Sequence, residues 1–374
     1  MIRRDDAGQR LDRFLRKLLP GSPLGNIFKL LRKGVVRVND RRAEGDLRLA
    51  EGDRVSLRMS DAALDEFAPS AEFRALRRAG TDVPGPGAPS APSAPRAQNA
   101  PGAPRTPVRS ERPTPAAPAP VRSRRLRMPE LSILHRDEHV LAVDKPPFVL
   151  VQPGEDAGQG EPTLDAMVLD VVGRGDALTF HPSLAHRLDR GTSGIVLFGM
   201  SAAGLRGLTE MFRKREVGKH YLALVAGNPE KDEFTVDLPL ARDLSDDTRG
   251  AKVKVSRGAG AQEAVTDFEV LGRNAKLGFA LLEARPRTGR THQIRAHLRA
   301  VRLPIVGDPT YGDPRRNPDW AKQPGLRRQF LHAWRVRLPH PVDAGRTLEI
   351  EAPLPDDLRR ALAWAGLGGS LPRA

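Results

Sequence analysis

The sequence predicts an α+β protein in which a large C-terminal domain with a mixed or antiparallel sheet follows a small domain of two helices and paired strands. Short apolar or alternating segments, typical of strands, recur from residue 130 onward and are interrupted irregularly by helical segments. A Pro- and Ala-rich segment separates this region from a compact N-terminal unit with its own helical periodicity. The expected boundaries are 1–60 for the small domain, 61–128 for the linker and 129–374 for the large domain.

The N-terminal unit is expected to contain two helices followed by a β-hairpin-like pair. Apolar residues at helical spacing predict the first helix over 11–18. Ser22 and Pro23 are expected to be the N-cap and first position of the second helix. Alternating apolar and polar residues then predict strands at 36–38 and 54–57.

Positive charge is concentrated in this unit. The chain has 61 Lys+Arg and 46 Asp+Glu, a formal charge of +15, and residues 1–60 alone carry 15 basic and 8 acidic side chains. Arg32, Lys33 and Arg37 cluster around the second helix and the following turn, and such a basic face suits recognition of RNA phosphates. A solvated face on a protein–protein module is the alternative. Arg outnumbers Lys 50 to 11, so genome composition, rather than function, is an alternative explanation for part of this positive charge.

The segment 61–128 is expected to be a flexible linker. Residues 84–120 hold 12 of the 34 prolines, and Val108 is their only branched apolar side chain. Such a segment cannot bury enough surface to offset the entropy lost on ordering, so an extended, Pro-stiffened conformation is expected. The arginines within 122–127 either contact phosphates or form a solvated charge run.

In the large domain, strands are expected at 132–135, 140–144, 194–198, 221–225, 265–270, 279–284, 334–338 and 348–350, and helices at 201–214, 291–300 and 356–365. Cysteine is absent, which excludes disulfides, thiol nucleophiles and Cys-ligated metals. No stretch approaches eighteen consecutive apolar residues, so no membrane association is expected. Acidic residues directly after Arg3 and Arg4 argue against a signal peptide, and a cytoplasmic location is expected.

The densest polar cluster is HRLDRGTSG at 186–194, directly before an apolar strand. Asp189 lies between Arg187 and Arg190, whose charges are expected to keep it ionised, as a reactive carboxylate requires. A loop at the edge of a strand can hold such a group rigidly. A buried structural ion pair is one alternative, and a phosphate-binding loop is another, although the Gly-Lys-Ser/Thr ending of a nucleotide loop is missing.

A second cluster, TGRTHQIRAHL, occupies 288–298. Thr291 is expected to cap a helix on which His292 and Arg295, three residues apart, share a face. A metal site is a weaker alternative. His292 and His297 lie about 140° apart around a helix, so the i, i+4 spacing of a zinc helix is missing, as is a Glu between them. No metal is expected.

Six motifs occur in order along the large domain: ILHRDEHVLAVDKPP, HRLDRGTSGIVLF, KHYLALVAG, TGRTHQIRAHL, GDPTYG and FLHAWRVRLPHP. Together they resemble the RluA-type pseudouridine synthases over 130–366. The N-terminal segment KLLRKGVVRVN resembles a small RNA-binding domain that a ribosomal protein shares with rRNA-modifying enzymes. Two positions depart from the family pattern: Gly191 stands where an acid is usual, and Gln152 replaces a common His.

The resemblance implies an enzyme that isomerises specific uridines in RNA to pseudouridine without a metal, nucleotide or redox cofactor. The layout is most similar to the family's large-subunit rRNA enzymes, which implies 23S ribosomal RNA or its precursor as the partner. A monomer is expected, because nothing in the sequence demands a larger assembly. A non-catalytic rRNA-binding assembly factor and a metal-dependent RNA phosphoesterase are the alternatives.

The resemblance also implies the site residues. Asp189 would act on the sugar or the ring, and Arg295 would pair with it. Tyr221 would stack on the target base, although a strand aromatic with no such role is the alternative, and Ile294 would pack against the ring. The target base must leave the RNA stack, and Arg187 would fill the space it vacates, with a structural salt bridge as the alternative.

Overall fold

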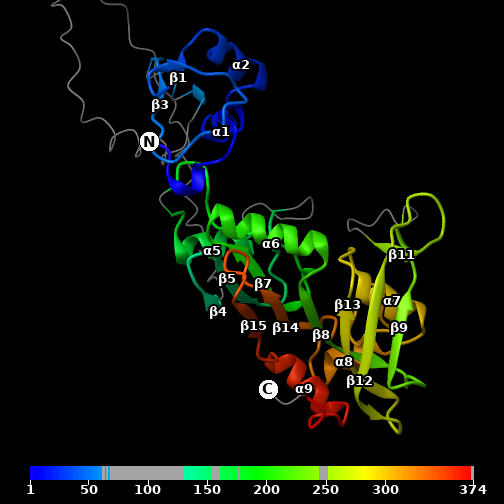
Figure 1. Cartoon of the computed structure of the whole chain (residues 1–374). Coiled ribbons are helices and arrows are strands. Elements are labelled where there is room, and N and C mark those ends of the chain that lie inside the picture. Colours follow the sequence, from blue (N-terminus) through cyan, green and yellow to red (C-terminus); the bar gives the residue numbers. More distant parts are fainter. Residues whose placement is uncertain are drawn as a thin grey trace, which may run out of the picture.

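The structure of the chain, a computed structural model, describes residues 1–60, 64, 66–67, 130–153, 161–175, 177–243 and 252–371. It contains a small N-terminal domain and a large domain built on one extended sheet (Figure 1). Nearly all of the segment 61–128, which the sequence predicts to be a linker, lies outside the described residues.

The N-terminal domain packs two short helices against a three-stranded antiparallel sheet of order β2-β1-β3. Its elements are η1 (Arg4–Asp6), α1 (Leu11–Leu18), α2 (Leu24–Arg32), β1 (Val36–Val38), β2 (Arg41–Arg42) and β3 (Val55–Leu57). The apolar stripe of α1, including Leu11, Phe14 and Leu15, is fully buried, because residues at this spacing share one helical face. Leu64 is buried against the same core, and the Phe67 carbonyl accepts a hydrogen bond from Gly21 N (2.9 Å).

The prediction that Ser22 caps the second helix is wrong. Pro23 occupies the cap position of α2, which has no side-chain capping bond. The Ser22 hydroxyl instead accepts a hydrogen bond from Asn26 Nδ2 (3.0 Å). Ser22 lies one position before the cap, so its hydroxyl contacts a side chain of the first helical turn and not the free backbone N–H groups of that turn.

The large domain is built on a mixed sheet. Strands follow the order β4-β5-β7-β14-β8-β13-β12-β9, with β15 beside β14 and β6 beside β7. Only the β7–β14 pair is parallel among the described strands of this sheet. A two-stranded β10–β11 ribbon is separate. The sheet strands are β4 (Ser132–Arg136), β5 (Val140–Lys145), β6 (Ser183–Leu184), β7 (Ser193–Gly199), β8 (Gly218–Ala226), β9 (Glu233–Asp237), β12 (Val265–Asn274), β13 (Phe279–Pro286), β14 (Leu331–Pro339) and β15 (Thr347–Glu351), and the ribbon strands are β10 (Leu240–Arg242) and β11 (Val253–Val255).

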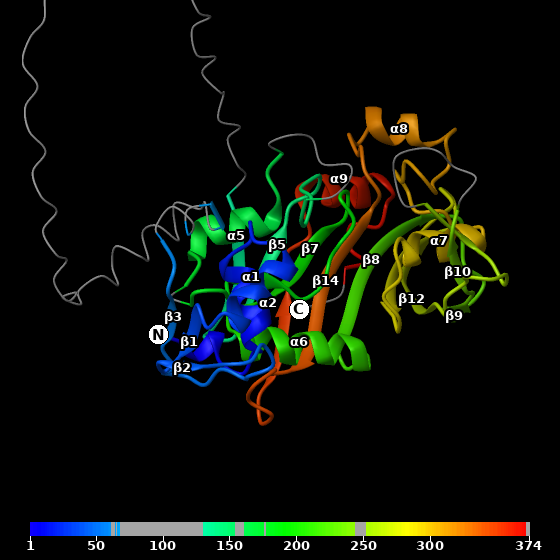
Figure 2. The same ribbon diagram turned by 90° about the horizontal axis from the view of Figure 1, so that it is seen from above.

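Helices cover both faces of the sheet, and this explains its apolar runs. The helices are α5 (Leu164–Val172), α6 (Ala202–Lys214), α7 (Gln293–Ala300), α8 (Asn317–Lys322) and α9 (Asp356–Trp364). Seen from above, α5 and α6 lie on opposite sides of the central strands (Figure 2). Ile195 and Leu197 of β7 pack with Leu208 of α6, whereas Val196 and Phe198 pack with the α5 side. A strand buried on both faces reads as a continuous apolar run, as residues 194–198 do.

The N-terminal domain contacts the large domain through acidic side chains of η1. Asp6 is fully buried, and its carboxylate accepts hydrogen bonds from Leu178 N (2.6 Å), Thr179 N (2.9 Å) and Thr179 Oγ1 (2.7 Å). Asp5 Oδ1 accepts from the N–H of Ala202, the first residue of α6 (2.9 Å). Because a free N–H group and positive dipole charge lie at a helix N-terminus, a carboxylate is stabilised there. We call these contacts of Asp5 and Asp6 the carboxylate clasp.

Asp6→Ala is expected to release the N-terminal domain from the large domain. The variant leaves the N–H groups of Leu178 and Thr179 without acceptors at a buried site, which costs about 1–3 kcal/mol for each group that water does not reach. Small-angle X-ray scattering should show a larger radius of gyration than in the parent protein. Asp40→Ala, which removes an exposed acid of the same domain, should leave it unchanged, and equal values for all three proteins would contradict the expectation.

Candidate active site

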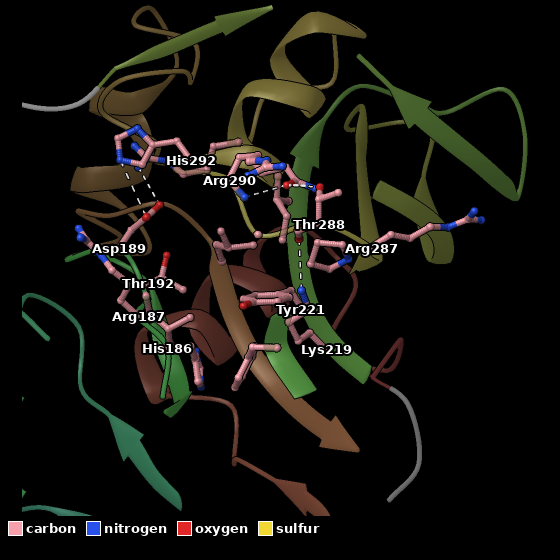
Figure 3. Close-up of a pocket in the computed structure, with 18 of the residues that line it drawn as sticks. His186, Arg187, Asp189, Thr192, Lys219, Tyr221, Arg287, Thr288, Arg290 and His292 are labelled. Carbon is pink, nitrogen blue, oxygen red and sulfur yellow. Dashed lines mark hydrogen bonds and ion pairs between the residues drawn. The ribbon is translucent and has the colours of Figure 1, made fainter. Parts of the chain in front are cut away.

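A pocket of about 490 Å³ lies between the loop that precedes β7 and the start of α7 (Figure 3). Strand β8 contributes Lys219 and Tyr221, and β14 contributes Leu331. Both polar clusters of the sequence meet here, since the lining includes residues of 185–192 and of 286–295. The pocket therefore unites segments about a hundred positions apart in the chain.

A carboxylate and a buried guanidinium form the centre of the pocket. Arg295 Nη1 donates to Asp189 Oδ2 at 3.0 Å, and the Arg295 side chain is only 5% exposed. Arg295 also donates from Nε and Nη2 to the fully buried Asp308, at 2.7 and 2.9 Å. Burial alone would lower the pKa of Arg295, but the two carboxylates, Asp308 first, raise it above its ordinary value. Arg295 is thus a fixed cation that orients Asp189.

The role of Asp308 is missed by the sequence analysis. Its Oδ1 accepts hydrogen bonds from the N–H groups of Thr310 and Tyr311, both at 2.9 Å. Such bonds from the backbone two and three residues on are typical of an Asp that begins a turn. The motif GDPTYG carries this signal, but the partner Arg295 lies thirteen residues away and is invisible in the spacing.

His292 lies beside the same carboxylate. Its Nε2 is 3.9 Å from Asp189 Oδ1, and its Nδ1 is 3.2 Å from the Tyr311 hydroxyl. The prediction that Thr291 caps the helix is wrong. His292 itself occupies the cap position with a left-handed backbone (φ 51°), which turns its ring toward the pocket. Burial lowers the pKa of His292, so its imidazole is neutral at pH 7.

Tyr221 and Ile294, to which the resemblance assigns contacts with the target base, both line the pocket. Tyr221 lies on β8, between two core clusters, and Ile294 is 6% exposed on the first turn of α7. Burial, and next the charge of Asp189, raise the pKa of the Tyr221 phenol well above its ordinary value. The phenol therefore stays protonated at neutral pH and presents a neutral aromatic surface.

Arg187 and Arg190, which flank Asp189 in sequence, do not form an ion pair with it, which corrects the expectation. The Arg187 side chain is exposed, lines the pocket and forms no hydrogen bond or ion pair with the described residues. Arg190 points elsewhere: its Nη2 pairs with Glu161, and its Nε donates to the Phe148 carbonyl (3.2 Å). Neighbouring side chains in an irregular loop point in different directions, so Asp189 turns toward Arg295 instead.

Two buried cations hold the loop that carries Asp189. Arg328 is fully buried and donates from Nη1 to the Gly191 carbonyl and to Ser193 Oγ, both at 3.1 Å, and from Nε and Nη2 to Asp357. Lys145 Nζ donates to the carbonyls of Pro146, Val149 and Arg190, at 3.0, 3.0 and 3.1 Å. Burial, with the charge of Arg328 next, lowers the pKa of Lys145 to about 7.

The structure explains why glycine occupies position 191 of this loop and position 194 at the start of β7. A Cβ on Gly191 would lie 2.4 Å from Gln329 Oε1, so Gln329 fills the space into which a side chain at 191 would extend. Gln329 also donates to Thr192 Oγ1 (3.2 Å). Gly194 has φ 111°, and a Cβ there would lie 2.2 Å from the Ala333 carbonyl, where β7 pairs with β14. Only glycine fits this close approach of two backbones.

The remaining histidines of the two clusters have structural contacts. His186 Nε2 accepts from Leu197 N (3.0 Å), and His297 bonds to Thr266 Oγ1 and the Leu238 carbonyl (both 3.0 Å). Within the described part of the chain, no group of three or more His, Asp or Glu side chains is arranged to hold a metal ion. No helix described by the structure is long and apolar enough to cross a membrane.

The predicted RNA-contacting cations of the N-terminal domain are not part of the pocket. Arg32 and Lys33 are exposed at the end of α2, and Arg37 on β1 is half-buried, with Nη1 donating to the Asp40 carbonyl (2.9 Å). None of the three lines the pocket.

Comparisons with known proteins identify the family of this chain. A family profile described as "RNA pseudouridylate synthase" matches residues 139–300. An uncharacterized RNA pseudouridine synthase of Mycobacterium bovis is 36% identical over 250 residues, which cover 66% of this chain and 77% of that protein. The ribosomal large subunit pseudouridine synthases C of Salmonella typhimurium and Escherichia coli are each 32% identical over 363 residues, which cover 96% of this chain and 94% of theirs. The solved structure of human RNA pseudouridylate synthase domain containing 4 is 28% identical, has a TM-score of 0.50 and covers 63% of this chain and 93% of its own.

The chain belongs to the RNA pseudouridine synthases, isomerases that convert uridine in RNA to pseudouridine. Within this family it is of the RluA type, and it is similar over nearly its whole length to ribosomal large subunit pseudouridine synthase C.

Proposed function

We propose that this enzyme isomerises specific uridines of large-subunit ribosomal RNA, with Asp189 as its catalytic carboxylate. The observation that carries the proposal is the pair of Asp189 and the buried Arg295, 3.0 Å apart in a pocket lined by Tyr221. The rRNA substrate is supported by the names of the ribosomal large subunit enzymes that match 96% of this chain, including its N-terminal domain. A cytoplasmic location and a monomeric state belong to the same proposal.

The reaction conserves every atom of the nucleotide. The bond between uracil N1 and ribose C1′ breaks, the uracil turns within the pocket, C5 bonds to C1′, and the proton leaves C5 for N1. Asp189 either attacks the sugar or ring, or removes a sugar proton. Since Oδ2 accepts from Arg295, Oδ1 is the oxygen left for this work. Arg295 holds the carboxylate in position.

The aromatic and aliphatic walls suit a uracil ring. Tyr221 stacks on the base with its protonated phenol, and Ile294 packs against the ring from another side. Arg187, exposed at the pocket and without a partner among the described residues, fills the space that the extruded uridine leaves in the RNA. A planar guanidinium can both stack there and hydrogen-bond to phosphate.

The N-terminal domain adds affinity for the surrounding RNA in this proposal, through Arg32, Lys33 and Arg37. Arg32→Gln/Lys33→Gln is expected to weaken RNA binding and to reduce the slope of log affinity against log salt concentration by about 1.4–1.8, because each lost phosphate contact contributes about 0.7–0.9. The rate constant for bound RNA should not change. The charge-matched variant Lys231→Gln/Lys276→Gln, with exposed residues outside the pocket, should keep the parent slope, and a slope unchanged by Arg32→Gln/Lys33→Gln would contradict the role.

The whole function is tested by mapping pseudouridine across the ribosomal RNA of cells with and without this gene. We expect one or a few large-subunit uridines to lose the modification when the gene is deleted. Reintroduction of the parent gene should restore them, and Asp189→Asn should not. Sites lost only from another RNA class would overturn the substrate, and sites restored by Asp189→Asn would overturn the catalytic assignment.

A further inference from the structure

Phe148 has an unusual combination of backbone strain and exposure. It has a φ of 68°, in the left-handed region that bulky residues rarely adopt, and its side chain is 51% exposed. This conformation costs free energy, and an aromatic ring half in water gains little from packing in return. A strained residue that persists at a solvent-exposed position is a reason to look for a function.

The surrounding backbone fixes Phe148 to the loop of the catalytic carboxylate. Phe148 N donates to the Arg190 carbonyl (2.8 Å), and Arg190 Nε donates back to the Phe148 carbonyl (3.2 Å). Lys145 Nζ joins the same two segments, through the carbonyls of Val149 (3.0 Å) and Arg190 (3.1 Å). Arg190 directly follows Asp189, so the exposed ring is held in a defined place next to the catalytic loop.

The surroundings of the ring match one kind of occupant. Phe148 does not line the pocket, so it does not contact the uracil that enters it. Arg190 is hydrogen-bonded to its backbone and also pairs with Glu161, whereas Arg187, three residues before Arg190, is exposed. An exposed aromatic face on a basic loop binds an unpaired nucleotide, because the base stacks on the ring and the phosphate is attracted to the positive charge of the loop. An acidic or apolar protein surface would match only one of these two features.

We propose that Phe148 stacks on an unpaired base of the substrate RNA next to the extruded uridine. The residue is a substrate-binding group outside the uracil pocket, and it contributes to the choice of site by requiring an unstacked neighbour. The proposal rests on RNA being the substrate and extends it to the nucleotides that flank the target.

The test compares four variants, Phe148→Ala, Phe148→Gly, Phe148→Leu and Phe148→Trp, on an unmodified large-subunit rRNA transcript. Loss of one base–aromatic stack should raise KM about 5- to 100-fold in Phe148→Ala and Phe148→Gly, with kcat within twofold of the parent value. Phe148→Leu should behave like them, because it keeps apolar bulk without a π-face. Phe148→Trp should restore the parent KM.

Thermal unfolding distinguishes recognition from a structural role. Glycine adopts φ 68° without strain, so Phe148→Gly should unfold at the parent temperature or above it while binding RNA less well. Leu277→Ala, with a side chain 50% exposed outside the pocket, should change neither KM nor the unfolding temperature.

Three outcomes would overturn the proposal. The first is a KM within twofold of the parent value in Phe148→Ala and Phe148→Gly. The second is a Phe148→Leu variant that acts like the parent. The third is a parent protein that dimerises through Phe148, with Phe148→Ala becoming monomeric at unchanged KM. A parent protein that makes no pseudouridine in this transcript would instead overturn the proposed substrate.

Discussion

Asp189→Asn is expected to reduce pseudouridine formation by about 10⁴-fold or more, because the variant removes the charged oxygen that the reaction needs. The substitution is nearly isosteric. The amide oxygen of Asn can still accept from Arg295 Nη1, and Arg295 keeps its two bonds to the buried Asp308. Fold and RNA affinity should therefore be retained while the chemical step is lost.

Single-turnover assays with saturating enzyme measure this step directly, and a filter-binding assay on the same transcript measures affinity. Asp319→Asn, an acid of α8 outside the pocket, is the matched control and should react at the parent rate. Conversion by Asp189→Asn at a rate near that of the parent would show that another group performs the chemistry.

Arg295→Met should have the largest effect on stability. Asp308 is fully buried, and removal of its bidentate partner leaves an uncompensated charge, which costs about 3–5 kcal/mol. For a domain of this size, such a loss lowers the unfolding temperature by about 6–20 °C. Activity should fall as well, since Asp189 loses the cation that orients it.

A surface pair supplies the control for this variant. Arg273 pairs with Asp232, whose side chain is 82% exposed, so Arg273→Met should cost about 1 kcal/mol or less. Differential scanning calorimetry compares the two variants with the parent. Equal unfolding temperatures for Arg295→Met and Arg273→Met would contradict the importance of the buried pair. The double variant Arg295→Met/Asp308→Asn, which removes the buried charge but keeps an oxygen acceptor for the N–H groups of Thr310 and Tyr311, should recover part of the stability and none of the activity.

The central strands could be predicted from the residue pattern, whereas the meeting of the two polar clusters followed only from the family resemblance. The apolar run at 194–198 marks a strand buried on both faces, and β7 is that strand. The spacing predicted that His292 and Arg295 share a helix face. In the structure His292 precedes α7 as its cap residue, and both side chains lie near Asp189. The pairing of Asp189 with Arg295 came from the family resemblance, because the local sequence favoured Arg187 and Arg190 as its neighbours.

The supports of the site could not be predicted, since they join residues far apart in the chain. The contact of Arg328 with the Gly191 carbonyl spans 137 positions. In the sequence, Arg328 is one cation of a basic run, and nothing marks it as fully buried. The contacts of Lys145 could not be predicted from the sequence for the same reason. Its three carbonyl acceptors exist only once β5, the turn after it and the Asp189 loop have come together.

The helix α5 was not predicted from the sequence, for a different reason. Its sequence, LDAMVLDVV, is apolar on most sides, so a run of this length lacks the polar stripe that distinguishes a surface helix from a strand. The structure resolves the ambiguity by placing Leu164 and Val168 against the sheet. The contacts of Asp5 and Asp6 with the large domain could not be predicted either, because nothing in two consecutive acidic residues indicates a distant partner.

The carboxylate clasp also sets an order of events during synthesis on the ribosome. The N-terminal domain has its own core up to about residue 67, but the groups that receive Asp5 and Asp6 are at 178–179 and 202. At a translation rate of about 5–20 residues per second, roughly ten seconds separate the emergence of these two halves. During synthesis the folded basic N-terminal domain is therefore exposed, and its orientation is not fixed until Asp5 and Asp6 bind these groups of the large domain.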